Sequence, residues 1–249
     1  MKNTNWLKNA YIAHRGFHSQ DKSIPENSLL AFKKAMNHGY AIELDIHVLK
    51  DGQVVVFHDD DLLRMCNSKL KLRDVSYEEI KNFLLLESNE KIPLLTDVLK
   101  LIDSKVPLLI ELKPKGDIYS LCENFIKAID KYQGPYAIQS FNPKVVLWFK
   151  KNHPQIIRGQ LAEFFTNDHT IKKSTKYLLK SLFFNRFSKP DFINYGIKDL
   201  PNKYVDKARK KRMIIIGYTA TNIKDFEMMK EHYDNSVFEF FHPNKKSHS

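Results

Sequence analysis

The sequence lacks the features that would place it in a specialised class of protein. Its two cysteines, Cys66 and Cys122, are too few for a disulfide framework, and their separation matches no metal-ligand spacing. Eight glycines and ten prolines among 249 residues exclude a collagenous or low-complexity chain. No run of about 18 apolar residues is present, and the first residues contain no apolar core of a signal peptide. These absences favour a soluble, unsecreted protein, and we expect a cytoplasmic location.

Positive charge is in excess and unevenly distributed. Lys and Arg number 40 against 29 Asp and Glu, which gives a formal net charge of +11. Residues 169–190 contain six Lys or Arg and no acid, and a second basic cluster covers residues 207–212. Such patches attract polyanions, but a high pI alone does not indicate a nucleic-acid partner, and none is expected. We interpret the first segment as a solvated helix face. Peripheral contact with an anionic membrane is an alternative, because Leu, Phe and Tyr are interleaved with its charges.

Short runs of β-forming residues recur along the chain with helical patterns between them, as in βαβ units. The expected strands are 11–14, 42–46, 108–112, 137–140, 156–160, 192–195, 214–218 and 237–240. The expected helices are 28–38, 96–104, 118–132, 143–152, 201–212 and 222–232, with Asn27 and Thr96 as capping residues. Eight such repeats in about 250 residues are typical of a (β/α)8 TIM barrel. An open doubly wound sheet would also alternate, but it usually carries a glycine-rich first turn, which this sequence lacks.

The pair Asp51-Gly52 separates two apolar-rich runs and predicts a β-hairpin on the second strand. A turn centred on this pair would place Asp45 opposite His58. The residues after the hairpin, at about 59–93, are too many for a loop. The predicted fold is therefore α/β, a (β/α)8 barrel with a small insertion after a β-hairpin on the second strand. Because no Pro-, Gly- or Ser-rich linker is present, we expect residues 1–249 to form one domain.

Three carboxylates stand where a barrel would place its active site, toward the ends of its strands. Glu43 and Asp45 share one face of the second strand, and Glu111 lies on the next barrel strand. This all-oxygen set suits a hard divalent cation such as Mg²⁺ or Ca²⁺, whereas zinc would call for more His or Cys. His47 shares the same strand face and is interpreted as structural or as a support for the site.

Two histidines and two cations complete the candidate site. His14 and His58 could supply a general acid and a general base, and Arg15 and Lys113 could hold an anion. The charges of three carboxylates and one phosphodiester are balanced by these two cationic side chains and one divalent cation. The residues therefore favour metal-assisted phosphoryl transfer.

Five short motifs occur in order along the chain: His14-Arg15-Gly16, Pro25-Glu26-Asn27-Ser28, Glu43-Leu44-Asp45, the stretch from Asp51-Gly52 to His58-Asp59, and Ile110-Glu111-Leu112-Lys113. In order and spacing they resemble the glycerophosphodiester phosphodiesterase family. The resemblance continues through residues 92–95 and 139–143. At residues 62–67 the chain keeps the family's Leu-x-Arg, at Leu62 and Arg64, but lacks its usual Thr and Gly. It departs from the family mainly in the last third, where Tyr218 replaces the usual Trp.

The resemblance implies a (β/α)8 barrel with a small insertion, a requirement for one divalent cation (Mg²⁺ or Ca²⁺, with Mn²⁺ possible) and hydrolysis of glycerophosphodiesters to an alcohol and glycerol 3-phosphate. By matching positions, it implies the acid/base pair His14 and His58, the metal ligands Glu43, Asp45 and Glu111, and the phosphate contacts Arg15 and Lys113. Glu26 and Asn27 would either orient Arg15 or cap the helix that follows.

The leading hypothesis is therefore a cytoplasmic phosphodiesterase for glycerophosphodiesters. One alternative is a lysophospholipase D-like enzyme acting at a membrane surface. Another is a barrel that has lost catalysis and serves in binding, which the seven intact site residues disfavour. The residues leave open the alcohol released, the physiological metal, which His is the acid, whether water or a substrate hydroxyl attacks, and the oligomeric state.

Overall fold

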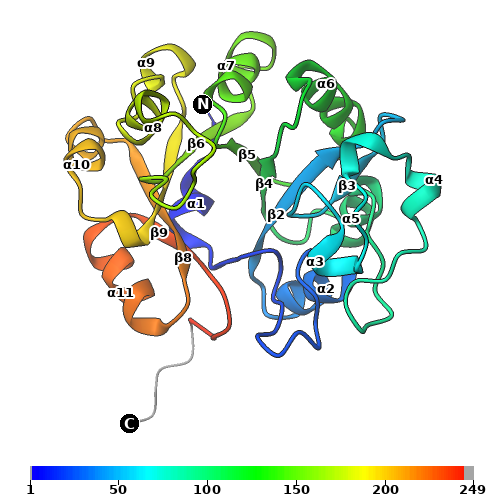
Figure 1. The fold of residues 1–249 in the computed structure, drawn as a ribbon. Helices are drawn as coiled ribbons and strands as arrows, with labels where there is room; N and C mark the ends of the chain where they lie inside the picture. Colours follow the sequence, from blue (N-terminus) through cyan, green and yellow to red (C-terminus); the bar gives the residue numbers. More distant parts are fainter. Residues whose placement is uncertain (1, 244–249) are drawn as a thin grey trace. The chain divides into compact units, whose positions relative to one another are not determined.

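The computed structural model describes residues 2–243, along which strands and helices alternate (Figure 1). The chain divides into two units. The first is Ile12–Ala137, and the second combines the residues up to Tyr11 with those from Ile138 onward. Each unit is described by itself below. The eight predicted strands are all present among the described residues, each within a few positions of its expected bounds.

The first unit contains the hairpin, the insertion and the predicted site. Its elements are β1 (Ile12–Ala13), α2 (Leu29–Asn37), β2 (Ala41–Val48), β3 (Val54–Val56), α3 (Leu63–Cys66), the 3₁₀ helix η1 (Leu72–Asp74), α4 (Tyr77–Ile80), α5 (Leu95–Ile102), β4 (Leu108–Leu112) and α6 (Ile118–Ile129). Strand β5 (Tyr136–Ser140) crosses from this unit into the second.

Strand β2 is the central strand of the first unit, and seven of its eight residues are buried. On one edge it pairs in parallel with β4, with Asp45 next to Glu111. It also pairs with β1 in parallel near its start, through Ala41 and Ile42, and with β3 antiparallel near its end. Because β1 and β3 run in opposite directions, the loops that follow them both arrive beside the middle of β2. The fold therefore brings three distant segments to Glu43 and Asp45.

The hairpin is present, but its predicted register is wrong by one residue. His47 faces Val55 and the amide of Phe57 donates to the carbonyl of Asp45 at 3.0 Å, so Phe57 and not His58 lies opposite Asp45. The reason is the turn. A two-residue turn on Asp51-Gly52 would need positive φ at both residues, whereas only Gly52 adopts it, at +83°. The chain forms a longer loop, closed by the Leu49 amide and the Gln53 carbonyl at 2.8 Å.

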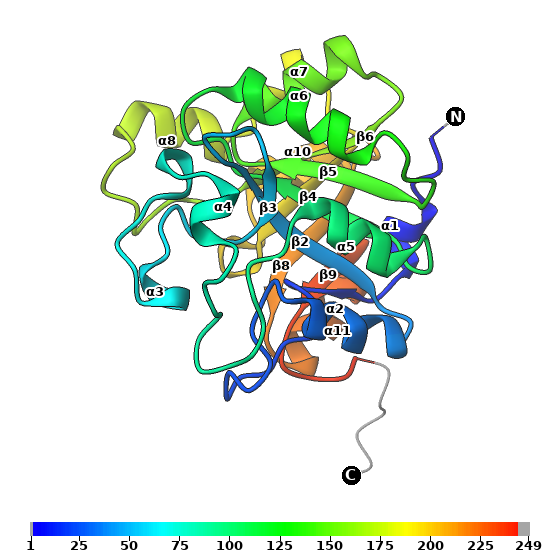
Figure 2. The ribbon, with the colours of Figure 1, turned by 90° about the vertical axis from the view of Figure 1, so that its right-hand side faces the viewer.

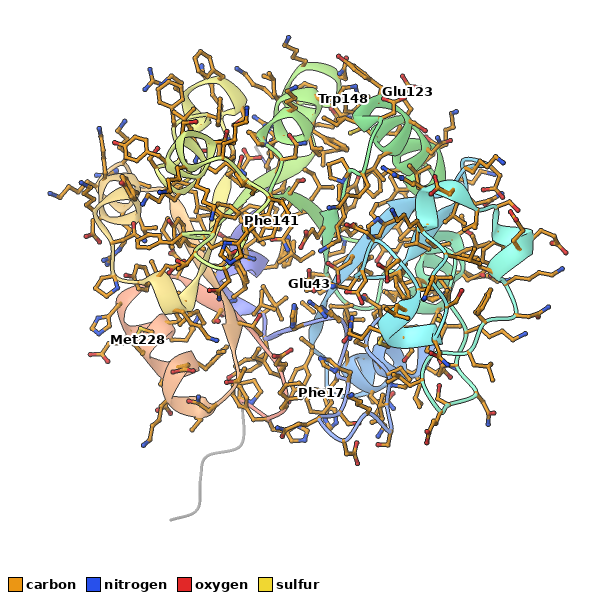
Figure 3. The ribbon with its side chains drawn as sticks, in the orientation of Figure 1. Phe17, Glu43, Glu123, Phe141, Trp148 and Met228 are labelled. Atoms are coloured by element: carbon orange, nitrogen blue, oxygen red, sulfur yellow. The ribbon has the colours of Figure 1, made fainter. Side chains whose placement is uncertain are left out.

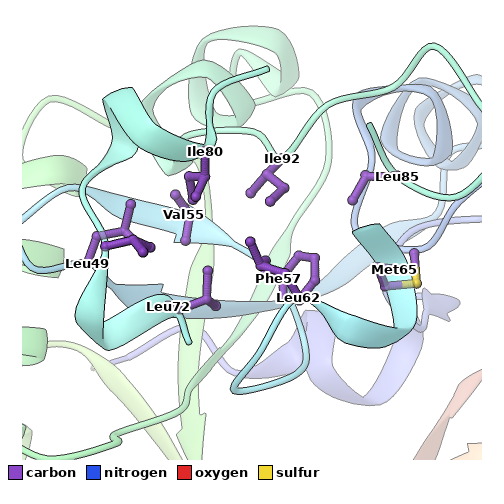
Figure 4. Packing of buried hydrophobic residues seen from close by; sticks show 10 residues of the cluster. Leu49, Val55, Phe57, Leu62, Met65, Leu72, Ile80, Leu85 and Ile92 are labelled. Carbon is purple, nitrogen blue, oxygen red and sulfur yellow. The ribbon is translucent and has the colours of Figure 1, made fainter. Parts of the chain in front are cut away.

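The predicted insertion contains α3, η1 and α4 and has its own small apolar core (Figure 4). Its buried members from the hairpin, Leu49, Val55 and Phe57, pack against Leu62, Met65, Leu72, Val75, Ile80, Leu85 and Ile92. Figure 2 shows this insertion, in cyan, with α4 next to β3. Apolar packing against the hairpin thus holds the insertion next to β3, the strand that precedes His58.

The second unit has the parallel order β6, β7, β8, β9. Its elements are α1 (Asn5–Asn9), α7 (Pro143–Asn152), β6 (Ile157–Ala162), α8 (Lys173–Lys180), α9 (Asn185–Ser188), β7 (Phe192–Gly196), the 3₁₀ helix η2 (Ile197–Asp199), α10 (Lys203–Arg209), β8 (Ile214–Ala220), α11 (Ile223–His232) and β9 (Asn235–Phe238). Lys2 holds the N-terminal segment to this unit through an ion pair with Asp191 at 2.6 Å.

Most of the longer helices begin at a polar capping side chain. Four of these caps are Asp or Asn residues that accept from amides of the first turn: Asp117, Asn142, Asn202 and Asn222. The two predicted caps are wrong. Helix α2 is capped by Ser28, which accepts from the Ala31 amide at 3.1 Å, and α5 begins after Leu94, so that Thr96 lies inside its first turn. Among residues 2–243, no helix is long and apolar enough to span a bilayer.

Candidate active site

The three predicted carboxylates come together in the first unit. Alternation along β2 directs Glu43 and Asp45 to one face, and the parallel register with β4 places Glu111 beside Asp45. Each contributes an oxygen to a set whose members all lie within 4.8 Å of one another, and all three residues are buried. Glu43 is labelled on β2 in Figure 3. Two general rules, strand alternation and parallel strand pairing, are enough to build this cluster.

The two histidines reach the cluster on the loops that follow β1 and β3. The first loop is attached to β2 by the Gly16 amide, which donates to the Glu43 carbonyl at 3.2 Å. In that loop the Nε2 atom of His14 lies 4.0 Å from Oε2 of Glu43. On the second loop, His58 is near enough to interact electrostatically with Asp45 and Glu111. Both predicted acid/base residues therefore lie at the carboxylates.

A glycine is required next to His14 and Arg15 for two reasons. Gly16 has φ of +79°, in the left-handed region that favours glycine. A Cβ atom at this position would also lie 2.9 Å from the side chains of Ala31 and Phe32 on α2. The tight turn allows the Arg15 amide to donate to Oε2 of Glu43 at 3.1 Å. The His-Arg-Gly motif is thus explained by the close packing of this loop between β2 and α2.

The two predicted phosphate contacts flank the carboxylates. Nζ of Lys113 lies 3.4 Å from Asp45 and 3.3 Å from Glu111, while Nε of Arg15 lies 3.5 Å from Asp45. That Nε atom is buried and, among the described residues, has no hydrogen-bond partner. The Arg15 guanidinium thus places a buried positive charge beside Asp45, which would also attract an anionic oxygen of a ligand.

The pKa values of Glu43, Asp45 and Glu111 are shifted because the three side chains are buried and carry like charges close together. Burial raises the pKa of Glu43 well above its usual value, and the charges of Asp45 and Glu111 raise it further. Burial raises the pKa of Glu111 as well, more than Lys113 lowers it. Burial acts in the same direction on Asp45, but Lys113, His58 and Arg15 outweigh it and hold the Asp45 pKa well below its usual range. Ionisation is therefore favoured at Asp45 and disfavoured at Glu43 and Glu111.

This pattern fits a bound divalent cation. Three buried carboxylates face two cationic side chains, so full ionisation of the cluster would leave excess negative charge, which burial penalises. All the candidate ligand atoms in the cluster are carboxylate oxygens, which Mg²⁺, Ca²⁺ and Mn²⁺ prefer. A cation would favour the ionised form of Glu43 and Glu111 and offset the charge of the cluster. The residues present therefore fit the predicted metal site.

Glu26 and Asn27 hold the site in place. Oε1 of Glu26 accepts from Nη1 of Arg15 at 2.7 Å, so Glu26 orients that guanidinium. Nδ2 of the Asn27 side chain donates to Oδ2 of Asp45 at 2.9 Å. Oδ1 of Asn27 accepts from the backbone amide of Asp45 at 3.3 Å. Of the two roles that the sequence left open, orientation is therefore the one the structure shows, with Asn27 acting on Asp45.

The sequence alone did not indicate that Arg64 connects the two sides of the site. Nε of Arg64 donates to Oδ2 of Asp59 at 2.6 Å, and its two terminal nitrogens donate to Glu26 at 2.7 and 2.9 Å. Asp59 in turn is 2.7 Å from Nδ1 of His58. A continuous chain therefore runs from Arg15 through Glu26, Arg64 and Asp59 to His58. The Leu-x-Arg motif was the only sequence signal for it, because Arg64 lies 38 positions from Glu26.

The chain of contacts also sets the tautomer of His58. Burial raises the pKa of Asp59, but hydrogen bonds from His58 and Arg64 outweigh it and place that pKa well below the usual value. Asp59 is thus an acceptor, so Nδ1 of His58 donates to it and Nε2 remains for proton exchange. His47 also supports this residue, with Nε2 at 3.2 Å from the His58 carbonyl. Burial lowers the His47 pKa to about 4, so His47 is neutral and acts structurally, as expected.

A cavity of about 330 Å³ opens beside Lys113. Its lining combines His47 and Lys113 with groups of both signs from the insertion and from the loop after β4: Asp60, Asp61, Lys71, Arg73 and Lys115. The insertion therefore shapes the space next to the carboxylates. A small polar molecule would find both donors and acceptors there.

Comparisons with known proteins agree with this arrangement. Residues 14–238 match the Glycerophosphoryl diester phosphodiesterase family. A glycerophosphodiester phosphodiesterase of Caldanaerobacter subterraneus subsp. tengcongensis is 34% identical over 240 residues, which cover 90% of this chain and 97% of the relative.

Solved structures show the fold. A phosphodiesterase of Oleispira antarctica in complex with the product sn-glycerol-3-phosphate has a TM-score of 0.79 at 20% identity and covers 95% of both chains. A glycerophosphodiester phosphodiesterase of Thermotoga maritima has a TM-score of 0.71 at 22% identity and covers 92% of this chain and 93% of its own. These likenesses confirm the predicted (β/α)8 barrel with its small insertion. The family match spans most of the chain, and the histidines, carboxylates and cations of the family's motifs converge in the first unit. This protein therefore belongs to the glycerophosphodiester phosphodiesterase family and is a phosphoric diester hydrolase.

Proposed function

We propose that this site hydrolyses glycerophosphodiesters to an alcohol and glycerol 3-phosphate with the help of one divalent cation. The observation that carries the proposal is the convergence of three buried carboxylates with His14, His58 and two cationic side chains in one unit of a family member. The relatives named as glycerophosphodiester phosphodiesterases and the glycerol 3-phosphate in a structural neighbour support this choice of substrate. The free thiols of Cys66 and Cys122 support the cytoplasmic location that we also propose.

In the proposed mechanism, Glu43, Asp45 and Glu111 are the metal ligands, with Mg²⁺, Ca²⁺ and Mn²⁺ as the candidate ions. A bound cation would polarise a non-bridging oxygen of the diester and offset negative charge in the transition state. Asn27 keeps Asp45 in position through its two hydrogen bonds, so the ligand set is held before substrate arrives.

Arg15 and Lys113 bind the phosphate and orient it. Burial opposes the charge on Lys113, but the carboxylates of Glu111 and Asp45 raise its pKa, so it stays cationic. The Arg15 guanidinium would attract a phosphate oxygen by its charge, while its Nη1 remains on Glu26. The released alcohol would lie in the cavity beside Lys113, which is walled by the insertion.

His14 and His58 exchange the protons. One accepts a proton from the attacking water or hydroxyl, and the other donates a proton to the oxygen of the leaving alcohol. Nε2 of His58 is available for this exchange because Asp59 holds its Nδ1. Each histidine lies on a loop fastened to β2, so both rings are positioned relative to the ligands of the metal.

We expect Arg64→Ala to lower kcat/KM by about 10- to 100-fold. Arg64 binds Glu26 and Asp59, and these two acids in turn position Arg15 and His58. Steady-state kinetics on glycerophosphocholine measure this. Arg64→Lys should recover only part of the loss, since a single ammonium cannot make the forked contact with both acids. The matched control is Arg209→Ala, at an exposed end of α10, which should leave kinetics unchanged. Wild-type kinetics in a folded Arg64→Ala protein would remove Arg64 from the mechanism.

Product analysis tests the substrate class. Purified protein with Mg²⁺, Ca²⁺ or Mn²⁺ should release glycerol 3-phosphate from glycerophosphocholine and glycerophosphoethanolamine, and detergent micelles should not be needed. Lysophosphatidylcholine in micelles is the comparison substrate. Turnover confined to lysophosphatidylcholine would instead support the lysophospholipase D-like activity, and no turnover of either substrate by folded protein would support a binding role.

A further inference from the structure

The basic segment, residues 169–190, forms an outer surface of the second unit that its own fold covers only in part. It contains helices α8 and α9 in the connection between β6 and β7. Helix α8 buries none of its eight residues, which is unusual for a helix with three large apolar or aromatic side chains. Tyr177 is 55% exposed and Phe187 is 51% exposed. Leu178, Leu179, Phe183 and Phe184 are only half-buried.

Hydrogen bonds join the basic segment to the rest of the second unit. Nζ of Lys176 donates to the Phe165 carbonyl at 2.7 Å, and the Tyr195 hydroxyl donates to the Lys180 carbonyl at 2.9 Å. Lys150 donates to the Phe187 carbonyl at 2.6 Å. These bonds fix the backbone and leave the leucine and aromatic side chains partly exposed to solvent. The exposure of these side chains is therefore a property of a well-anchored segment.

Cations are interleaved with the rings. The guanidinium carbon of Arg186 lies 3.9 Å from the ring centre of Phe183 and 5.8 Å from that of Phe187, and Nζ of Lys180 lies 5.1 Å from that of Phe164. Within residues 2–243 the six cations of the segment form no ion pair with a carboxylate. The segment has no acid of its own, and Asp168 next to it interacts with Lys176 only at longer range. Their charge is available to an outside anion.

We propose that the basic segment docks this protein on an anionic lipid bilayer. Lysines and an arginine at the rim would contact anionic headgroups, while Tyr177, Phe187 and the half-buried leucines would enter the boundary between headgroups and acyl chains. Nucleic acid would also attract the charge, and its bases could stack on the rings. It would leave Leu178 and Leu179 without a role, since aliphatic side chains do not stack. The docking surface uses no residue of the catalytic site, so it is independent of the proposed reaction.

Vesicle sedimentation of the full chain tests the proposal. We expect binding at about 0.1 M salt to vesicles containing about one third phosphatidylglycerol, and weak or no binding to phosphatidylcholine alone. The triple variant Lys172→Gln, Lys173→Gln, Arg186→Gln should lower the partition coefficient by about 10²-fold. Its matched control carries the same charge loss at the other basic cluster: Lys207→Gln, Lys210→Gln, Lys211→Gln, all exposed on or after α10. The control should change binding by less than about threefold.

A second pair of substitutions separates docking from simple charge attraction. Tyr177→Ser with Phe187→Ser keeps the net charge and should lower the partition coefficient about tenfold. All variants should turn over glycerophosphocholine as the wild type does, which also shows that they fold. Three results would overturn the proposal: no binding to anionic vesicles, equal loss in the two triple variants, or single-stranded oligonucleotide binding that is tighter than vesicle binding and is lost in the same variants.

Discussion

Replacing His58 by alanine is expected to lower turnover by about 10²- to 10⁴-fold while leaving the affinity for the divalent cation nearly unchanged. The physical reason is that, in the proposed mechanism, His58 exchanges a proton and is not a ligand of the cation. Its Nδ1 is bound to Asp59, and its Nε2 is the atom that remains for proton exchange. His14→Ala should give a loss of the same order. Single-turnover rates on glycerophosphocholine and calorimetric metal titration of each variant measure the two effects separately.

A matched control is available in the same chain. His153→Ala removes an imidazole of the second unit that stacks on Trp148 at 5.4 Å and belongs to none of the site motifs, and it should leave both turnover and metal affinity unchanged. If the His14 and His58 variants lost metal affinity as severely as turnover, the assignment of the histidines to proton exchange would be wrong, and they would belong with the ligands.

Glu43→Gln is expected to weaken binding of the divalent cation on the order of 10²-fold and to abolish turnover at low metal concentration. The change keeps the shape of the side chain and removes one of the three carboxylates that we propose as ligands and that lie within 4.8 Å of one another. In the metal-free protein the same change should not reduce the free energy of unfolding. Burial, Asp45 and Glu111 already oppose ionisation of Glu43 and raise its pKa, so a neutral amide relieves repulsion there.

Urea unfolding with and without the cation distinguishes this effect from a general loss of structure. At a cation concentration of about 100 times its dissociation constant, the wild type should gain about 2.7 kcal/mol and the variant much less. Glu123→Gln, which removes an exposed carboxylate on α6, is the matched control and should gain as much as the wild type. A Glu43→Gln protein that binds and responds to the cation normally would show that the metal site lies elsewhere.

The carboxylate cluster could be predicted from the sequence because it depends on two general rules of parallel sheets. Alternation places Glu43 and Asp45 on one face, and the pairing of consecutive parallel strands places Glu111 next to Asp45. The hairpin register could not be predicted to the residue, because it depends on how many residues the turn uses. With positive φ only at Gly52, the loop is one residue longer than the Asp-Gly pair suggests.

The supporting contacts were less accessible to sequence reasoning. Asn27 was expected to cap a helix, but the adjacent Ser28 caps it, and Asn27 binds Asp45 at a separation of 18 positions. Arg64 reaches Glu26 across 38 positions because the insertion folds back on the site. Neither contact follows from a local pattern. Both depend on the packing of a loop and an insertion around β2. The single-domain prediction for residues 1–249 stays a prediction.

The central claim is that the carboxylate cluster and the two histidines form a cation-dependent site for glycerophosphodiester hydrolysis. The metal dependence of product release tests this claim most directly. Purified protein is treated with EDTA, and glycerol 3-phosphate release from glycerophosphocholine is measured before and after separate addition of Mg²⁺, Ca²⁺ and Mn²⁺. We predict that EDTA abolishes release and that at least one of these ions restores it in the wild type, with Glu43→Gln requiring far more of the same ion. Full activity after complete removal of divalent cations would contradict the account.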